Sequence, residues 1–171
     1  MTSSALAADP VNIVRGPQCI AHRGASGAAP ENTLRAFARA VDAGATWLEL
    51  DVQMVDDRVV VLHDDTVDRT TDGRGRAAGF SFADLRRLDA GQGQQIPLLE
   101  EVLALVSGRA TINVELKGEA TAGPTAAILA AALARGGWQA EQFVLSSFDW
   151  PRLALAHERL PQLPIAPLLD G

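Results

Sequence analysis

The chain has 171 residues, of which 47% are hydrophobic and 21% charged, with a formal net charge of −6 and a pI near 5.0. This length and apolar content suit one folded domain with a real core and exclude a disordered tail. The acidic balance argues against a nucleic-acid partner, because basic side chains supply most of that binding energy. The sequence has no apolar run of about 18 residues, so no transmembrane segment is predicted.

The first residues carry little structural signal. Residues 1–17 show no periodicity and lack both the basic start and the apolar segment of a signal peptide. We therefore expect a loose lead-in over 1–17, one domain over 18–171 and a cytoplasmic location. Cys19 is the only cysteine, which excludes an internal disulfide, and we expect it to be a small buried residue at the start of a strand. The sequence does not indicate an oligomeric state.

The first half of the domain begins with a strand, a helix and a second strand. The pattern predicts a strand over Gln18–His22 and another over Trp47–Met54. Between them, Asn32 or Thr33 can cap a helix that Gly44 stops.

A third apolar stretch, Arg58–His63, follows after only two aspartates, Asp56-Asp57. This connection is too short for a helical crossover, so a tight hairpin and an extended crossover both remain possible. In a hairpin, His63 returns to the level of Leu50. In a parallel arrangement, it ends its strand at the same rim as Asp51. Either way, we expect His63 near the acids of the preceding strand.

The second half continues the alternation of helices and strands. Residues 64–79 are rich in Gly, Asp and Arg and predict a loop. The elements expected after it are a helix from Ser81 to Gly91 with a capping box at Ser81 and Asp84, a helix from Pro97 to Gly108, a strand over Thr111–Lys117, a helix over Thr125–Arg135, a strand over Phe143–Phe148, a helix over Asp149–Leu160 and a strand over Ile165–Leu169. Strands with one polar face fit an α/β barrel of the TIM type better than an open sheet. Catalytic groups then lie at the C-terminal ends of the strands.

Two carboxylates share one face of the strand over Trp47–Met54. Side chains alternate along a strand, so Glu49 and Asp51 project to one side while the apolar residues between and beside them project to the other. Two acids on one face of an otherwise apolar strand repel each other and lose hydration unless a cation or a proton lies between them. The pattern therefore predicts a metal site.

The strand over Thr111–Lys117 adds two charged residues on one face, Glu115 and Lys117. Three carboxylates offer only oxygen ligands, which suits Mg²⁺ or Ca²⁺ and disfavours zinc. Lys117 is the only lysine among the 15 Lys and Arg residues of the chain. A compact ammonium beside Glu115 in such an arginine-rich chain indicates a point charge, which can neutralise charge on phosphoryl oxygens. The simpler interpretation is an ion pair with Glu115 or Glu49.

Five polar blocks occur in order along the chain: His22-Arg23-Gly24, Pro30-Glu31-Asn32-Thr33, Glu49-x-Asp51, His63-Asp64 and Glu115-x-Lys117. At these separations they resemble the glycerophosphodiester phosphodiesterase family. Further matching stretches are Asp68–Gly75, Ile96–Leu103 and Ser146–Phe148. The resemblance runs from about Cys19 to the C-terminus and implies a (β/α)₈ barrel with metal ligands at Glu49, Asp51 and Glu115.

The resemblance also implies the reaction: a metal-dependent hydrolysis of a glycerophosphodiester to glycerol 3-phosphate and an alcohol. The glycerol hydroxyl attacks phosphorus while one of His22 and His63 takes its proton and the other protonates the departing alcohol. A cyclic glycerol phosphate can then be hydrolysed. An imidazole with an ordinary pKa of about 6.5 suits either role. The sequence does not distinguish the two roles, and our working hypothesis makes His22 the base and His63 the acid.

The remaining polar residues receive minor or supporting roles. Arg23 is expected to contact the phosphate together with Lys117, because a guanidinium can bind two oxygens at once. Glu31 and Asn32 are expected to brace the first loop and cap its helix. His157, in the middle of a predicted helix, is expected to be structural or exposed.

Two rival functions follow from the same residues. A lipid-directed phosphodiesterase, similar to a lysophospholipase D or sphingomyelinase D, would be favoured by an apolar access surface, which the polar loop 64–79 does not suggest. A catalytically inactive binding module would be expected to have lost a histidine or a metal acid, and none is missing.

The predicted barrel is incomplete. Eight strands typically need about 250 residues, whereas the sequence offers six candidate strands. In the family that this sequence resembles, the chain continues with two strands that carry a Trp-Thr-Val-Asn-like block and a Gly-rich, Asp-containing block. Neither block occurs in this sequence. A truncated sequence, a partner chain that supplies the missing wall and a degenerate fold would each account for this. Truncation is the explanation we favour.

Overall fold

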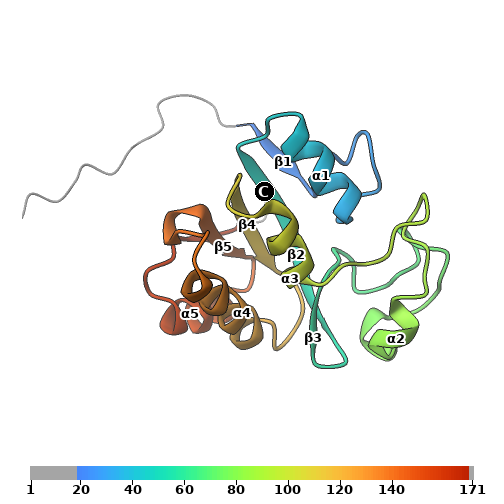
Figure 1. The fold of residues 1–171 in the computed structure, drawn as a ribbon. Coiled ribbons are helices and arrows are strands. Elements are labelled where there is room, and N and C mark those ends of the chain that lie inside the picture. Colours follow the sequence, from blue (N-terminus) through green and yellow to red (C-terminus); the bar gives the residue numbers. More distant parts are fainter. Residues whose placement is uncertain (1–18, 170–171) are drawn as a thin grey trace, which may run out of the picture.

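The computed structural model describes residues 19–169, so the predicted lead-in over 1–17 lies outside the described residues. A parallel sheet forms the centre of this part (Figure 1). Its strands follow one another in space in the order β1 (Ile20–His22), β2 (Trp47–Val55), β4 (Thr111–Leu116), β5 (Phe143–Ser147) and β6 (Ile165–Pro167). Each of the five lies within one or two residues of its predicted bounds.

The sixth strand, β3 (Arg58–Val61), is antiparallel to β2 and lies off the main path of the sheet. The turn at Asp56-Asp57 has φ values of 49° and 60°, the left-handed conformation that tight hairpins require. This decides in favour of the hairpin. The pairing continues as Leu62 donates its N–H to the Asp51 carbonyl at 3.0 Å. All six predicted strands exist, but β3 is one arm of a hairpin and does not extend the parallel wall.

Helices cover one face of the sheet. They are α1 (Leu34–Asp42), α3 (Leu99–Val106), α4 (Ala122–Arg135) and α5 (Trp150–Arg159). Figure 1 shows α3, α4 and α5 in front of the strands, and the side chains between the two layers form the main core, including Leu48, Leu50, Ile112, Phe143 and Leu129. The opposite face of the sheet carries the acids. Parallel strands with helices outside and polar groups inside make up part of a TIM-type barrel. None of the helices in residues 19–169 is long and apolar enough to cross a membrane.

Three helix boundaries differ from the predicted ones. The short helix α2 (Phe82–Leu85) has the predicted cap at Ser81 but ends before Gly91. Directly after Leu85 the chain tightens, because the N–H groups of Arg87 and Leu88 bond to carbonyls three residues back. Further along, the Asp89 carboxylate accepts the N–H groups of Gly91 and Gly93 and holds that part of the chain as a loop.

The other two shifts concern where helices α3 and α4 begin. Helix α3 begins after Pro97, because the Pro97 carbonyl still accepts the Val61 N–H of β3 at 2.8 Å. Helix α4 begins one turn before Thr125, since Pro124 is tolerated in a first turn where the N–H needs no partner.

A second, smaller core lies beside the sheet. It is built between β3, α2 and the loops that join them, around Val55, Val60, Leu62, Val67, Leu85 and Ile96. The loop predicted over 64–79 is present, except that its end forms a 3₁₀ turn at Ala77–Gly79; a second such turn, Ala140–Gln142, precedes β5. In Figure 1 this part of the chain, residues 64–96, which we call the α2 segment, stands to one side of the helix layer.

The prediction that Cys19 is buried is wrong. Cys19 is exposed, and Ile20 next to it retains 45% of its accessible surface. The reason is that, among the described residues, β1 pairs only with β2, so it forms an edge of the sheet. An apolar residue beside such an edge has fewer neighbours than the same residue in a central strand.

Candidate active site

Three carboxylates meet on the polar face of the sheet. Strands β2 and β4 pair in parallel with Asp51 directly opposite Glu115, and Glu49 lies two residues earlier on the same face. One oxygen atom from each of Glu49, Asp51 and Glu115 lies within 4.8 Å of the others, and all three residues are buried. The sequence-based prediction that these acids gather on one face therefore agrees with the structure.

Hydrogen bonds leave part of the buried carboxylate cluster without a donor. Burial, together with the charge of Asp51, raises the pKa of Glu49 to about 8. The buried Oε1 of Glu49 and Oδ1 of Asp51 accept no hydrogen bond. Glu115 Oε1 likewise accepts no hydrogen bond, although the Lys117 ammonium lies 2.7 Å away and forms an ion pair with it. Buried carboxylate oxygens without donors are costly, and a hard divalent cation with oxygen ligands fits them.

Arg23 closes one side of the cluster from the first loop, residues 23–33 between β1 and α1. Its backbone is in the left-handed region with φ of 57°, a strained conformation that often occurs at functional sites. In this conformation its N–H donates to Glu49 Oε2 at 3.0 Å, and its Nε lies 3.4 Å from Asp51 Oδ2. The guanidinium also donates to Glu31 at 2.9 Å. Arg23 is thus held by three acids beside the predicted metal position.

Lys117 occupies the other side. Its ammonium lies 2.7 Å from Glu115 Oε1 and 3.7 Å from Asp51 Oδ1. The same atom lies 5.6 Å from the centre of the Phe148 ring, within cation–π range. Only 21% of the side chain is exposed. A compact charge suits this position between two carboxylates and an aromatic face, where a planar guanidinium would need more room.

The two candidate catalytic histidines differ in their surroundings. His22 ends β1 with its Nε2 3.8 Å from Glu49, and 65% of its side chain is exposed. His63 follows β3, is 28% exposed and has its Nδ1 2.5 Å from Asp64 Oδ1. Gln53 of β2 donates to the His63 carbonyl at 3.1 Å, which ties this part of the chain to the strand that carries the acids. The third histidine, His157, lies in α5, as predicted.

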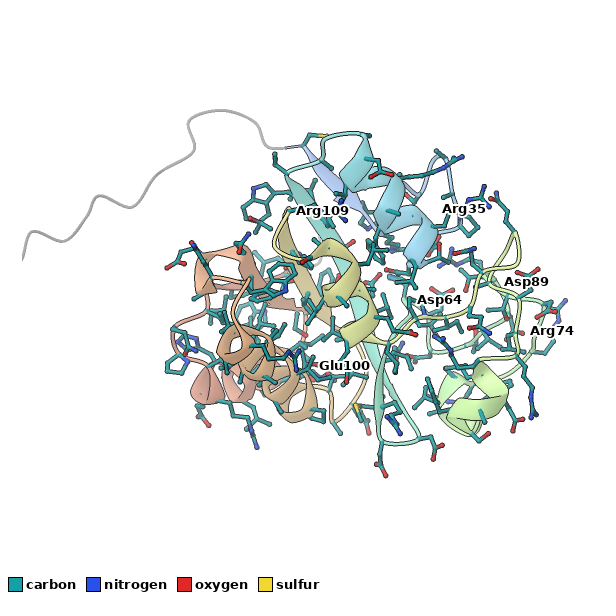
Figure 2. All side chains as sticks on the ribbon, viewed as in Figure 1. Arg35, Asp64, Arg74, Asp89, Glu100 and Arg109 are labelled. Atoms are coloured by element: carbon teal, nitrogen blue, oxygen red, sulfur yellow. The ribbon has the colours of Figure 1, made fainter. Side chains whose placement is uncertain are left out.

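Several residues near the site were assigned no direct role, or a different one, from the sequence. Asn32 donates to Asp51 Oδ2 at 2.9 Å and so orients a carboxylate, whereas the cap of α1 is Thr33. Asp64 binds His63, and Arg69 binds Asp64. All of these lie within blocks that resemble the family, so the signal was present, but the partner of Asn32 lies 19 residues away in the sequence. In Figure 2, Asp64 lies on the side of the α2 segment that faces α1 and α3.

A polar cavity of about 350 Å³ borders the lysine side of the cluster. Its lining includes Gln53, Met54, Asp65, Arg76, Lys117 and Gly118. The cavity lies between the end of β2, the α2 segment and the turn after β4. It is large enough for a small polar molecule and shares Lys117 with the carboxylate cluster.

Comparison with protein families gives a match over residues 22–171 to the glycerophosphoryl diester phosphodiesterase family. The chain belongs to this family. The matched range contains all seven predicted site residues. The matched family is also the one that the five polar blocks resemble.

Relatives that are named glycerophosphodiester phosphodiesterases are similar in sequence. The glycerophosphodiester phosphodiesterase of Bacillus altitudinis is 37% identical over 158 residues, which cover 86% of this chain and 64% of the relative. That of Caldanaerobacter subterraneus is 46% identical over 107 residues, or 57% of this chain and 44% of the relative. Human glycerophosphodiester phosphodiesterase 1 is 42% identical over 112 residues, or 59% and 34%. This chain thus spans about a third to two thirds of the length of these relatives.

Solved structures show the same fold. A phosphodiesterase of Oleispira antarctica, in complex with the product sn-glycerol-3-phosphate, matches with a TM-score of 0.80 and 36% identity over 91% of this chain and 67% of the other. A glycerophosphodiester phosphodiesterase from Agrobacterium tumefaciens matches with a TM-score of 0.77 and 30% identity, over 86% and 65%. The predicted TIM-type α/β barrel fold is confirmed, with about two thirds of each solved chain matched.

Proposed function

We propose that this glycerophosphoryl diester phosphodiesterase family chain forms the catalytic part of a metal-dependent enzyme that converts a glycerophosphodiester to glycerol 3-phosphate and an alcohol. The observation that carries the proposal is the buried cluster of Glu49, Asp51 and Glu115, with one oxygen of each unsatisfied by hydrogen bonds. These three would hold Mg²⁺ or Ca²⁺. When bound, such a cation supplies Lewis-acid stabilisation of the phosphoryl oxygens. The product seen in the Oleispira antarctica relative supports the substrate class.

Arg23 and Lys117 position the phosphodiester in this proposal. They flank the carboxylates from the first loop and from β4, so a phosphate at the cluster meets positive charge on two sides. The ammonium of Lys117 stabilises charge that develops on the phosphoryl oxygens in the transition state. The cavity of about 350 Å³ beside Lys117 receives the alcohol end of the substrate.

The histidines move the protons. In the first step the glycerol 2-hydroxyl attacks phosphorus, His22 takes its proton, and the bond from phosphorus to the leaving oxygen breaks as His63 protonates that oxygen. Water then opens the cyclic glycerol phosphate with the two roles exchanged. The Asp64 carboxylate at Nδ1 favours His63 as the acid, because it stabilises the imidazolium that gives up a proton from Nε2.

The test is an assay of glycerol 3-phosphate release from several glycerophosphodiesters with Mg²⁺, with Ca²⁺ and with chelator. We expect release that requires a divalent cation and that falls by about 100-fold or more in each of the variants His22→Ala and His63→Ala. Equal rates with cation and with chelator would contradict the metal assignment. Wild-type rates in both histidine variants would contradict the acid–base assignment.

A lysophospholipid-directed activity is the second candidate. It is favoured by two half-exposed aromatic residues between β5 and the start of α5, Phe148 and Trp150, which retain 49% and 53% of their accessible surface. Phe148 contacts Lys117, so this apolar surface adjoins the proposed phosphate position. Lysophosphatidylcholine and glycerophosphocholine, assayed side by side, separate the two candidates: a higher kcat/KM for the lysolipid would favour the second.

A further inference from the structure

Arg69 joins two acids that each contact a different candidate catalytic group. Its Nε donates to Asp64 Oδ2 at 2.7 Å and its Nη2 to Asp64 Oδ1 at 3.1 Å. On the other edge of the guanidinium, Nη1 and Nη2 donate to the two oxygens of Glu31, both at 2.8 Å. One guanidinium is therefore bound in bidentate fashion by two carboxylates from separate segments, the first loop and the start of the α2 segment. Such paired contacts fix angles as well as distances.

Each of the two acids also contacts a residue of the candidate active site: Asp64 contacts His63, and Glu31 contacts Arg23. The Oδ1 atom of Asp64 lies 2.5 Å from His63 Nδ1, and the Oε1 atom of Glu31 accepts a second hydrogen bond, from Arg23. Hydrogen bonds from Arg69 lower the carboxyl pKa values of Glu31 and Asp64 to about 2, so both groups are anionic at neutral pH. An anionic carboxylate has no proton to donate. In its contact with His63, the proton must therefore be on Nδ1.

We propose that Arg69 is a positioning residue for the phosphodiesterase reaction: by clamping Asp64 and Glu31 it fixes the tautomer of His63 and the orientation of Arg23. With Nδ1 committed as a donor to Asp64 in both charge states, His63 gives up and takes back only the proton on Nε2, so its neutral form is the Nδ1–H tautomer. Among the hydrogen bonds and ion pairs of the described residues, those of the Arg69 side chain go to Asp64 and Glu31 and not to the carboxylate cluster or to Lys117. Its effect passes through its two acid partners.

The tautomer of His63 can be measured directly by long-range ¹H–¹⁵N NMR of the imidazoles. The chain has only three histidines, so single His→Gln variants assign the signals. At a pH about two units above the ordinary imidazole pKa of about 6.5, we expect wild-type His63 as the Nδ1–H form. In Arg69→Gln we expect a mixture richer in Nε2–H, while His157 in α5 is unchanged and reports that the fold persists. An unchanged His63 tautomer in Arg69→Gln would overturn the proposal.

Arg69→Lys and Arg74→Gln complete the NMR experiment. Arg69→Lys keeps the positive charge but loses the bidentate contacts of the guanidinium, so it should shift the His63 tautomer partly. This variant also provides the test if Arg69→Gln fails to fold. Arg74, five residues further along, is the matched control: its side chain is 85% exposed and its nearest acid contact is 3.8 Å, from Asp68. Figure 2 shows it at the outer edge of the α2 segment, away from Asp64. Arg74→Gln should leave the His63 signals as in wild type.

The kinetic arm rests on the proposed phosphodiesterase function, whereas the NMR arm does not. With glycerophosphocholine and saturating cation we expect Arg69→Gln to lose about 100-fold in kcat, the scale of a small displacement of catalytic groups. Asp64→Asn should lose activity too, and the double variant should lose far less than the product of the two effects, because both act on one unit. Multiplicative losses would overturn the shared path through Asp64. A wild-type chain with no turnover would reject the proposed function and leave the tautomer result to decide on the clamp.

Discussion

Glu49, Asp51 and Glu115 place three carboxylates where little water reaches them, and this arrangement should be visible in stability. Asp51 is completely buried, and the two cationic side chains beside it, Arg23 and Lys117, are shared among the three carboxylates of the cluster. We expect Asp51→Asn to keep or raise the thermal midpoint in chelator and to abolish most of the rise that Mg²⁺ or Ca²⁺ gives the wild type. That rise corresponds to about 2.7 kcal/mol at a concentration 100-fold above Kd. Thermal scans with and without cation measure both effects, and an equal rise in the variant would exclude Asp51 as a ligand.

Lys117 allows a second test at the level of single residues. Lys117→Arg keeps the charge. The position between Glu115, Asp51 and Phe148 is enclosed, however, and it suits a compact ammonium better than a larger, planar guanidinium. We expect kcat to fall by about 100-fold, the scale of one lost transition-state donor. The reverse exchange at an exposed position of α1, Arg35→Lys, is the control and should change kcat little. Similar rates for Lys117→Arg and wild type would leave Lys117 as a generic ion pair.

The sequence predicted the positions of those candidate site residues that follow from periodicity. The alternation of side chains along a strand placed Glu49 and Asp51 on the same face, and composition singled out Lys117 as the only lysine. The contacts of Asn32 and Arg69 could not be predicted in this way. Their partners lie 19 and 38 residues away in sequence, for Asn32 with Asp51 and Arg69 with Glu31, and such pairs depend on how loops fold back on the sheet.

At the scale of elements, the contact between the first loop and helix α1 is a point where one added methyl group should matter. Gly24 has φ of +78°, and a Cβ there would lie 2.8 Å from both the carbonyl carbon and the Cβ of Ala36. Both the conformation and the space therefore require glycine. We expect Gly24→Ala to reduce the free energy of unfolding by about 2–4 kcal/mol, measured by urea denaturation. Gly27→Ala, in the same loop with open space around it, should change it by less than about 1 kcal/mol.

The elements themselves were largely predictable, because strands and amphipathic helices are local patterns. The exceptions are instructive. The two aspartates after β2 allowed either a hairpin or a crossover, and only the left-handed backbone at Asp56 and Asp57 decides for the hairpin. Helix α2 is shorter than its pattern suggests, because the N–H groups of Arg87 and Leu88 bond to carbonyls three residues back and not four. In both cases the outcome depends on backbone conformations that several sequences share, so residue type alone does not fix it.

At the scale of the whole described structure, two cores are linked by a charged contact. The main core lies between the parallel sheet and its helices, and the second core lies within the α2 segment. Arg69 comes from the α2 segment, whereas its partner Glu31 belongs to the first loop, which packs on α1. This contact therefore joins the α2 segment to the part of the sheet that carries the acids. It has a consequence for stability at low pH.

The last prediction concerns that pH dependence. Because the carboxyl pKa values of Glu31 and Asp64 are lowered to about 2 in the folded chain, both groups bind protons more readily when unfolded. Their stabilisation is thus complete above the ordinary carboxyl pKa of about 4 and is lost as the pH falls towards about 2. Since Arg69 is half exposed and solvent screens it, the loss is on the order of 1 kcal/mol.

The measurement compares the urea-unfolding free energies of wild type and Arg69→Gln across this acid range. In the variant the two carboxyl pKa values return towards ordinary ones, so the stability gap between the proteins should be widest near neutral pH and should close as the pH falls. Taking the difference cancels the titration of groups that Arg69 does not contact, including the buried carboxylates of the β2–β4 cluster. A gap that stays constant from neutral pH down to about pH 2.5 would mean that Arg69 stabilises the fold only by packing, without lowering the pKa of either acid.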